Sequence, residues 1–240
     1  GHYISTSSEY FFLVDVFKIN YLIEIIKFYK PDVIINCIGI TKQKIKKHSF
    51  NKIKYINSIF PHELYKICNN DKIRLIHLST DCVFSGDRGE YCISDIADAN
   101  DIYGKTKKEG EIVHENSLTI RKSTIGYELS KKHGLLEWFL KRKGDTEGYK
   151  NAIFTGISTI ELSRFLSYII SDHTDLGGIM HLRGPKIDKY SLLKKIKFYF
   201  GLSYINLIEE KNFYCNRSLK EDIVFSNLKY SFPNWDQMIK

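Results

Sequence analysis

Residues 74–81 read Arg74-Leu-Ile-His-Leu-Ser-Thr-Asp81, a short apolar run that ends in hydroxyl and carboxyl side chains. Its first part, residues 74–78, is bounded by polar residues and is typical of a buried strand. Segments with helical periodicity at residues 52–68 and 99–114 flank it on either side. Strands that alternate with helices in this way predict βαβ units and a parallel sheet.

The same alternation continues in both directions along the chain. Upstream we expect a strand at residues 11–14, a helix at 21–28 and a strand at 33–37. Downstream we expect strands at 118–120 and 179–182 and helices at 135–141, 159–171 and 190–200. The predicted fold class is α/β: a Rossmann-like parallel sheet with helices on both faces over residues 1–121, and a smaller C-terminal substrate-binding lobe over 122–240 with segments that return to the sheet.

The composition is that of an ordinary globular protein with a basic balance of charge. The 240 residues are 43% hydrophobic and 27% charged, and the formal net charge is +8. Basic residues that neutralise phosphates are the main source of nucleic-acid binding, but the lysines here are scattered over the predicted helices. We therefore expect no nucleic-acid partner. A basic surface also suits a small phosphorylated substrate and a dinucleotide.

The cysteines argue for a reducing compartment. There are five, Cys37, Cys68, Cys82, Cys92 and Cys215, and their spacing suggests neither a disulfide framework nor a metal site. No signal-peptide pattern opens the chain, and no apolar run reaches the roughly 18 residues that a membrane span needs. We expect a cytoplasmic protein with no metal and no membrane partner.

The pattern Tyr-x-x-x-Lys occurs three times, and its spacing places both side chains on one face of a helix. The pairs are Tyr103 with Lys107, Tyr127 with Lys131, and Tyr190 with Lys194. The last lies in an ordinary amphipathic helix, and Tyr127 lies in an irregular segment. Tyr103 differs because its helix follows the strand that ends in Ser79-Thr80-Asp81. Ligands of open parallel sheets bind beyond the carboxyl ends of strands, so these side chains can converge on one carbonyl.

This set of side chains suits the reduction of a ketone. Hydride from a nicotinamide adds to carbon, and the oxygen then needs a proton. A phenol with its usual pKa of about 10 is a poor acid at neutral pH. We expect the Lys107 ammonium to lower the pKa of Tyr103 and make it a workable proton donor, with Thr80 bonded to the same oxygen. Alternatively, the Thr80 hydroxyl satisfies its own backbone turn.

A glycine-rich loop for a cofactor pyrophosphate is missing from these residues. A dinucleotide-binding sheet opens with a strand followed by closely spaced glycines at a helix N-terminus. Here Gly1 is the sole glycine before Gly39. Either a strand, a helix and a strand of roughly 30 residues precede this sequence, or a dinucleotide binds in another way. We expect the first.

Several motifs carry a resemblance to a known family. They include residues 75–86, Leu-Ile-His-Leu-Ser-Thr-Asp-Cys-Val-Phe-Ser-Gly, then Gly89-Glu-Tyr91, Tyr103-Gly-Lys-Thr-Lys107 and Gly110-Glu111. Upstream lie Val14-Asp15-Val16, Pro31-Asp-Val-Ile-Ile-Asn-Cys37 and Asn57 with Pro61, and downstream Arg121-Lys-Ser123, Arg217-Ser-Leu219 and Trp235-Asp-Gln-Met-Ile239. The sequence resembles the dTDP-4-dehydrorhamnose reductase family of extended short-chain dehydrogenases over nearly its whole length, most densely from residue 31 to 121.

The resemblance implies reduction of the 4-keto group of a 6-deoxy sugar nucleotide by NADPH or NADH, for cell-surface polysaccharide synthesis. It implies Thr80, Tyr103 and Lys107 as catalytic residues, with Asn57 as a proton relay. Tyr103 and Lys107 would also contact the cofactor, together with Asp15, Val16, Asn36, Cys37, Ile38 and Ser79. The implied substrate-binding residues are Asp81, Val83, Phe84, Arg121, Ser123, Phe154 and Thr155.

The sequence departs from the family pattern on the substrate side. Cys37-Ile38-Gly39 replaces the usual small residues after Asn36, Arg121-Lys122-Ser123 replaces Arg-Thr-Ser, and the expected Pro-Thr pair is absent around Phe154-Thr155-Gly156. The 4-keto reduction is therefore a firmer expectation than the rhamnose pathway. The choice between NADH and NADPH stays open, as does the oligomeric state, with a homodimer among the options.

Two other functions remain as alternatives. A UDP-2-acetamido-2,6-dideoxy-hexulose reductase would share every catalytic residue. A non-catalytic nucleotide-binding or regulatory subunit with the same fold would explain the missing glycine loop, but it would not need the three catalytic residue types. An epimerase or dehydratase is less favoured, because Asp81 is the one extra acid or base close to Thr80.

Overall fold

A four-stranded parallel sheet organises the first part of the chain. The structure is a computed structural model that describes residues 12–128 and 133–240. The strand order is β1-β2-β3-β6, with every neighbouring pair parallel. The strands are β1 (Val33–Asn36), β2 (Arg74–Leu78), β3 (Ser117–Arg121) and β6 (Gly178–His181). The predicted parallel α/β sheet is confirmed, and its last strand comes from the second half of the chain.

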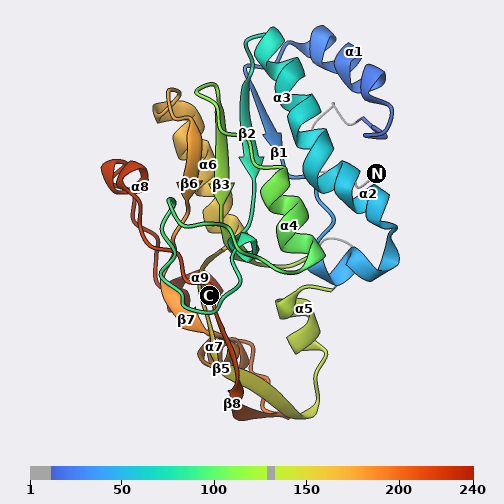
Figure 1. The fold of residues 1–240 in the computed structure, drawn as a ribbon. Helices are drawn as coiled ribbons and strands as arrows, with labels where there is room; N and C mark the ends of the chain where they lie inside the picture. The colour runs from blue at the N-terminus through green and yellow to red at the C-terminus, as the bar shows by residue number, and fades with distance from the viewer. Residues whose placement is uncertain (1–11, 129–132) are drawn as a thin grey trace.

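Helices cover both faces of this sheet (Figure 1). Helices α1 (Ile19–Tyr29), α3 (Phe60–Asn70) and α4 (Ile102–Glu109) lie on one side, and α6 (Thr159–Asp172) lies on the other. The pleat of β2 explains the two cores, because successive side chains point to opposite faces. Leu75 packs with α1 and α3, whereas Ile76 packs with α6. Both are fully buried, and burial of each stabilises the fold by about 1.5–3 kcal/mol.

A second sheet forms the lower part of the molecule in Figure 1. Strand β5 is its centre: it pairs in parallel with β4 and β8 and antiparallel with β7. The strands are β4 (Ser123–Ile125), β5 (Gly144–Ser158), β7 (Lys186–Asp188) and β8 (Ile205–Asn216). The remaining α-helices are α2 (Phe50–Lys54), α5 (Leu135–Leu140), α7 (Lys189–Tyr199), α8 (Ile223–Asn227) and α9 (Trp235–Ile239). Helices α5, α7 and α9 share a core with β5.

The predicted strand at residues 11–14 is wrong for its described part. Residues 12–15 form no strand, and Phe11 lies outside the described residues. A strand needs a hydrogen-bonding neighbour. Strand β1 is at the edge of the first sheet and pairs with β2 alone, so residues 12–14 have no partner strand in the described part of the chain.

Two predicted helices differ from the observed ones. The helix expected at 52–68 is α2, a π-helical turn η2 (Tyr55–Ile59) and α3 in unbroken succession. The helix expected at 99–114 is shorter. Helix α4 begins after Asp101, whose carboxylate accepts the Gly104 N–H at 2.9 Å, and ends at Gly110. A Cβ at Gly110 would overlap the Asn57 carbonyl, so glycine permits the close approach of the helix end to η2.

Candidate functional site

Thr80 lies at the carboxyl end of β2, where the chain enters the short 3-10 helix η3 (Asp81–Val83). Its hydroxyl oxygen accepts the Cys82 N–H at 3.1 Å and donates to Asp81 Oδ1 at 3.2 Å. The hydroxyl therefore does satisfy its own turn, as the simpler interpretation of the sequence held. The same bonds fix the Thr80 side chain at the strand end.

Helix α4 brings Tyr103 and Lys107 to the same edge of the sheet. Gly104 makes the approach close, because a Cβ there would overlap the Cys82 carbonyl. Burial raises the pKa of Tyr103, and the nearby Cys82 and Asp81 raise it further, while the Thr80 side chain has the opposite effect. The expected lowering of the phenol pKa by Lys107 is wrong for this structure, since desolvation of the phenolate outweighs the favourable contacts.

Lys107 is buried, and two residues of β2 contact its amino group. Its Nζ donates to the Leu78 carbonyl at 2.9 Å and lies 3.4 Å from His77 Nε2. Burial lowers the pKa of Lys107 to about 8, and the charge of Lys122 lowers it as well, while Glu111 and Cys37 oppose the shift. A lysine with this pKa can change its protonation state near neutral pH.

Asn57 lies in η2, the π-helical turn, and is fully buried. Its Oδ1 accepts the Ile40 N–H at 2.8 Å, and its Nδ2 donates to the Ile40 carbonyl at 3.1 Å. A Cβ at Gly39 would lie 3.6 Å from Asn57 Oδ1 and 4.0 Å from Lys107 Nζ. Asn57 and Lys107 therefore face the same small space beside Gly39. Single π-helical turns are frequent at functional sites, and the position of Asn57 in η2 agrees with that tendency.

The residues that the family resemblance implies for cofactor binding lie in three different environments. Cys37 and Ile38 are exposed at the carboxyl end of β1, while Asn36 is buried. The exposed Asp15 caps the Phe17 N–H at 3.1 Å, and the Val16 carbonyl accepts from Tyr55 at 3.0 Å, before α1. Ser79 is buried and donates to Glu111 at 2.7 Å. The exposed backbone at the end of β1 lies near Lys107, since a Cβ at Gly39 would be 4.0 Å from its Nζ, and it could hold part of a cofactor.

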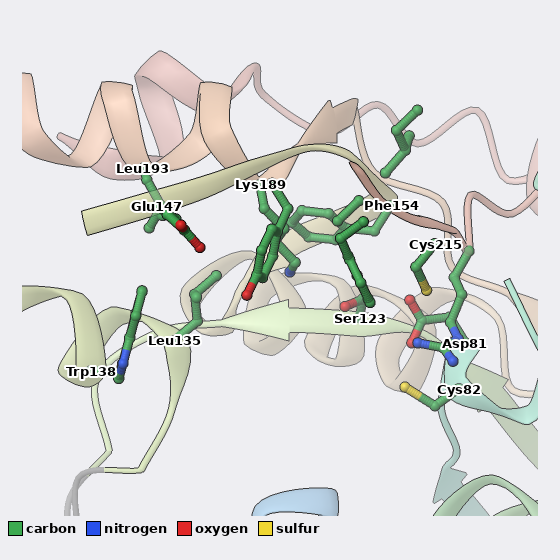
Figure 2. A pocket seen from close by; sticks show the side chains of 15 residues that line it. Asp81, Cys82, Ser123, Leu135, Trp138, Glu147, Phe154, Lys189, Leu193 and Cys215 are labelled. Atoms are coloured by element: carbon green, nitrogen blue, oxygen red, sulfur yellow. The ribbon is translucent and has the colours of Figure 1, made fainter. Parts of the chain in front are cut away.

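A cavity of about 400 Å³ is lined by Asp81 and Cys82, the two residues that follow Thr80, and by residues of the second sheet and its helices. Figure 2 shows Asp81 and Cys82 at one end and Trp138 and Glu147 at the other. Its walls come from η3, β4, α5, β5, α7 and β8. The polar and aromatic lining residues are Asp81, Cys82, Ser123, Trp138, Glu147, Tyr149, Phe154, Lys189, Phe213, Cys215 and Arg217.

The end of the cavity near Asp81 is rich in positive charge. Burial raises the pKa of Asp81, and the nearby Arg217 and Lys189 act against that rise. Lys189 Nζ lies 3.6 Å from the centroid of the Phe154 ring. Arg217 donates to the carbonyls of Phe84 and Ser85, each at 2.9 Å. Two cations and one buried carboxyl group thus meet where the cavity approaches Thr80.

The site lies within a stretch that matches a known family. Residues 2–145, more than half of the chain, match the model of the RmlD substrate binding domain. The chain belongs to this family. Thr80, Tyr103, Lys107 and Asn57 all lie inside the matched stretch.

Individual relatives show how far the likeness extends. A dTDP-4-keto-6-deoxy-D-glucose reductase of Streptomyces niveus is 34% identical over 84 residues, which are 35% of this chain and 29% of that protein. Methionine adenosyltransferase 2 subunit beta of Xenopus tropicalis is 31% identical over 110 residues, which are 45% of this chain and 32% of that protein. The aligned stretches thus span about a third or less of these two relatives.

The solved structures extend the likeness in fold to almost the whole chain. The dTDP-4-dehydrorhamnose reductase of Bacillus anthracis, crystallised in complex with NADP, superimposes with a TM-score of 0.81 at 21% identity. The match covers 95% of this chain and 85% of that one. At this identity the match establishes the shared Rossmann-like fold.

In this RmlD-family chain, the predicted substrate residues divide between cavity and interior. Asp81, Ser123 and Phe154 line the cavity. Val83 and Phe84 are fully buried, and the Thr155 hydroxyl accepts the Leu219 N–H at 3.0 Å. Arg121 is buried too: it forms a two-pronged ion pair with Glu111, both bonds at 2.8 Å, and approaches His181 at 3.3 Å. Its guanidinium therefore makes structural contacts in the protein interior.

Local sequence patterns did not indicate the second wall of the cavity. Lys189, Trp138 and Tyr149 come from α7, α5 and β5, which are distant in sequence from Thr80. Arg217 belonged to a family motif, but nothing in its spacing placed it by Asp81. The competing pair Tyr190 and Lys194 lies on α7, away from β2, and Lys131 of the third pair lies outside the described residues.

The described residues contain neither a metal-binding cluster nor a membrane-spanning helix. No group of His, Cys, Asp and Glu side chains there is arranged to hold a metal ion. None of the helices described is long and apolar enough to cross a membrane.

Proposed function

We propose that this chain carries out the NAD(P)H-dependent reduction of the 4-keto group of a 6-deoxy sugar nucleotide, in the cytoplasm, for polysaccharide synthesis. The observation that carries the proposal is the contact between Thr80 and Tyr103, with Lys107 one turn along the same helix, next to a cavity that Asp81 and Cys82 line. That cavity has cations at its Asp81 end and aromatic side chains at the other. Membership of the RmlD family and the likeness to the Streptomyces niveus reductase support the same reaction.

The side chains supply the proton that the reaction needs. A bound nicotinamide provides hydride for the carbonyl carbon. Tyr103 would donate its proton to the oxygen, where negative charge develops, and Thr80 would bond that oxygen. With a cofactor bound, Lys107 would be the group that returns a proton to the tyrosine oxygen. Asn57 holds the backbone of Ile40 beside this path.

The cavity suits a nucleoside diphosphate sugar. Lys189 and Arg217 would bind the diphosphate, since charge-assisted hydrogen bonds are strong in a buried site. Trp138, Tyr149 and Phe213 offer apolar faces for the base at the far end. The sugar would then lie between Asp81 and Ser123, within reach of Thr80.

The cofactor would be NADPH or NADH, as in the B. anthracis structure that contains NADP. Lys107 and Tyr103 would bind the nicotinamide ribose, and Cys37 and Ile38 would lie along it. Asp15 and Val16, on the turn before α1, would lie by the adenine.

The direct test is turnover by the full-length protein. It is incubated with NADPH or NADH and a dTDP-4-keto-6-deoxy sugar, and in parallel with a UDP-2-acetamido-4-keto-2,6-dideoxy sugar. Oxidation of the cofactor in step with reduction of one substrate supports the proposal and shows which nucleotide sugar is preferred. Absence of oxidation with both substrates, in protein that binds cofactor, would reject it.

A second candidate is a non-catalytic nucleotide-binding subunit. The likeness to methionine adenosyltransferase 2 subunit beta favours it, because that relative is named as a subunit of another enzyme. Such a protein would bind NAD(P)H without oxidising it and would tolerate loss of Tyr103. Calorimetric cofactor titration beside the turnover assay separates the two functions.

A further inference from the structure

A buried histidine lies between the cofactor edge of the sheet and the proposed catalytic lysine. His77 is in the middle of the sheet on β2 and has no exposed surface. Its Nδ1 lies 3.0 Å from Asn36 Nδ2, and its Nε2 lies 3.4 Å from Lys107 Nζ. Both ring nitrogens thus face nitrogen atoms, an arrangement that restricts where the protons can be.

The orientation of the Asn36 amide follows from its other neighbour. The Ile38 N–H donates to Asn36 Oδ1 at 3.0 Å, and a backbone N–H can only donate. The amide oxygen is therefore turned toward Ile38, and the amide NH₂ toward His77. His77 Nδ1 must then accept a hydrogen bond, so it carries no proton.

The protonation state of the ring completes the assignment. Burial holds the pKa of His77 well below its ordinary value, and the charge of Lys107 lowers it further. The imidazole is therefore neutral, and a neutral imidazole has one N–H. Since Nδ1 accepts from Asn36, the proton is on Nε2, the nitrogen that faces Lys107.

We propose that His77 is a positioning residue that acts through Lys107: held as the Nε2–H tautomer by Asn36, it directs an N–H at Nζ and favours the uncharged amine. An N–H dipole repels an ammonium at this distance but can donate to the lone pair of a neutral amine. Lys107 keeps its bond to the Leu78 carbonyl in either state.

Other groups also face the Lys107 ammonium. Lys122, after β3, acts in the same direction as His77, whereas Glu111 and Cys37, after α4 and β1, favour the charge. Tyr103 lies one turn away on the same helix. His77 differs from these groups because it contacts Nζ through a hydrogen atom whose position Asn36 determines.

The catalytic consequence rests on the proposed reductase function. After Tyr103 gives its proton to the sugar oxygen, the Lys107 ammonium would supply the proton that restores the phenol. This step leaves a neutral amine, which the His77 N–H can then hydrogen-bond, and water later restores the proton to Nζ. His77 thus favours the state in which Lys107 has given up its proton.

The tautomer is tested first, without turnover. Long-range ¹H–¹⁵N spectra of ¹⁵N-histidine-labelled protein distinguish a protonated from an unprotonated ring nitrogen, and the signal missing from His77→Phe identifies His77. We expect Nε2 protonated and Nδ1 bare from neutral pH upward. A proton on Nδ1 would overturn the proposal.

The effect on Lys107 is measured by titrating ¹³C-lysine-labelled protein, with Lys107→Met to identify its signal. In His77→Phe the Lys107 pKa should rise by about one pH unit, because the opposing N–H is gone. His114→Phe, at the other end of the sheet, is the matched control and should leave the pKa unchanged. An unchanged or lowered Lys107 pKa in His77→Phe would contradict the proposal.

A second variant tests the proposal in case His77→Phe does not fold. Asn36→Asp presents an acceptor to Nδ1, so the ring proton should move to Nδ1 and the Lys107 pKa should rise. A ring that keeps its proton on Nε2 in this variant would show that Asn36 does not set the tautomer. If the protein never oxidises NAD(P)H, the reductase function fails while these spectra still decide the role of His77.

Discussion

The two sheets contribute to the site in different ways. On the first sheet, Thr80, Lys107 and Asn57 are each held by hydrogen bonds to backbone groups of neighbouring elements. On the second, Lys189 lies over the ring of Phe154, and Trp138 is half-exposed along the cavity wall. In the proposed reductase, the first sheet would fix the geometry of the reacting groups, and the second would offer an adaptable surface for the nucleotide.

The largest expected effect is a loss of turnover when Tyr103, the proposed proton donor beside the first sheet, is changed. Tyr103→Phe removes one oxygen and should reduce kcat by about 10²–10⁴-fold, the usual contribution of a general acid. Tyr190→Phe, in the competing Tyr-x-x-x-Lys pair on α7, is the matched control and should keep its turnover. Steady-state kinetics measure both. Equal activity in the two variants would remove Tyr103 from its proposed role.

The buried ion pair between Glu111 and Arg121 should have the largest effect on the free energy of unfolding. Glu111→Gln breaks the ion pair with Arg121, in which both side chains are almost fully buried. Loss of one partner from a buried pair costs about 3–5 kcal/mol, because the other charge remains in the interior. Urea unfolding measures the change. Glu221→Gln, in the surface pair with Arg183, is the control and should cost about 0–1 kcal/mol.

A comparable loss in Glu111→Gln and Glu221→Gln would weaken the contrast between the sheets. It would mean that Arg121 can reach water or another partner when Glu111 loses its charge. Arg121 would then be free to turn toward the substrate, as the family resemblance implied.

The second sheet should influence binding more than chemistry. Lys189→Met removes a cation from the Asp81 end of the cavity and should raise KM for the sugar nucleotide by about 10- to 100-fold, because hydrogen bonds to charged groups contribute about 1.5–3 kcal/mol. We expect kcat to change little, since the charge binds ground state and transition state alike. Lys194→Met, on the exposed face of α7, is the control. A fall in kcat without a change in KM would place Lys189 in the chemistry instead.

The contrast between the sheets also explains which elements could be predicted. Strand β2 was predicted with its observed bounds, because a short apolar run between two helical segments is typical of a buried parallel strand. Thr80, Tyr103 and Lys107 followed from it, since α4 is the element directly after β2 and η3. Here local pattern and tertiary structure agree.

Strands β5 and β8 could not be predicted in the same way. Strand β5 contains Gly144, Asp145, Gly148 and Asn151, residue types that are depleted in strands. It is extended because β8 pairs with it over most of its length, and that pairing joins segments far apart in the sequence. The cavity depends on this pairing, so its second wall was invisible to local patterns. The strand predicted at 11–14 failed for the opposite reason: its composition suits a strand, but within the described part of the chain no neighbour pairs with residues 12–14.

The smallest expected effect tests a residue between the two sheets. Lys122 joins β3 to β4, stands where the family pattern has threonine, and lowers the pKa of Lys107. Lys122→Thr should therefore raise the Lys107 pKa above its present value of about 8. If the ammonium is the active form, activity is lost as pH rises through that pKa, so the alkaline limb of kcat/KM should move upward.

The pH dependence of kcat/KM measures this shift, and Thr124→Val provides the control. That change removes the hydroxyl that accepts from Lys122 Nζ at 3.0 Å but keeps the charge. It should leave the alkaline limb close to its original position. A shift in Thr124→Val as large as that in Lys122→Thr would mean that the placement of Lys122, more than its charge, controls Lys107. An unchanged limb in both variants would mean that Lys122 acts on the substrate side, as part of the second sheet's recognition surface.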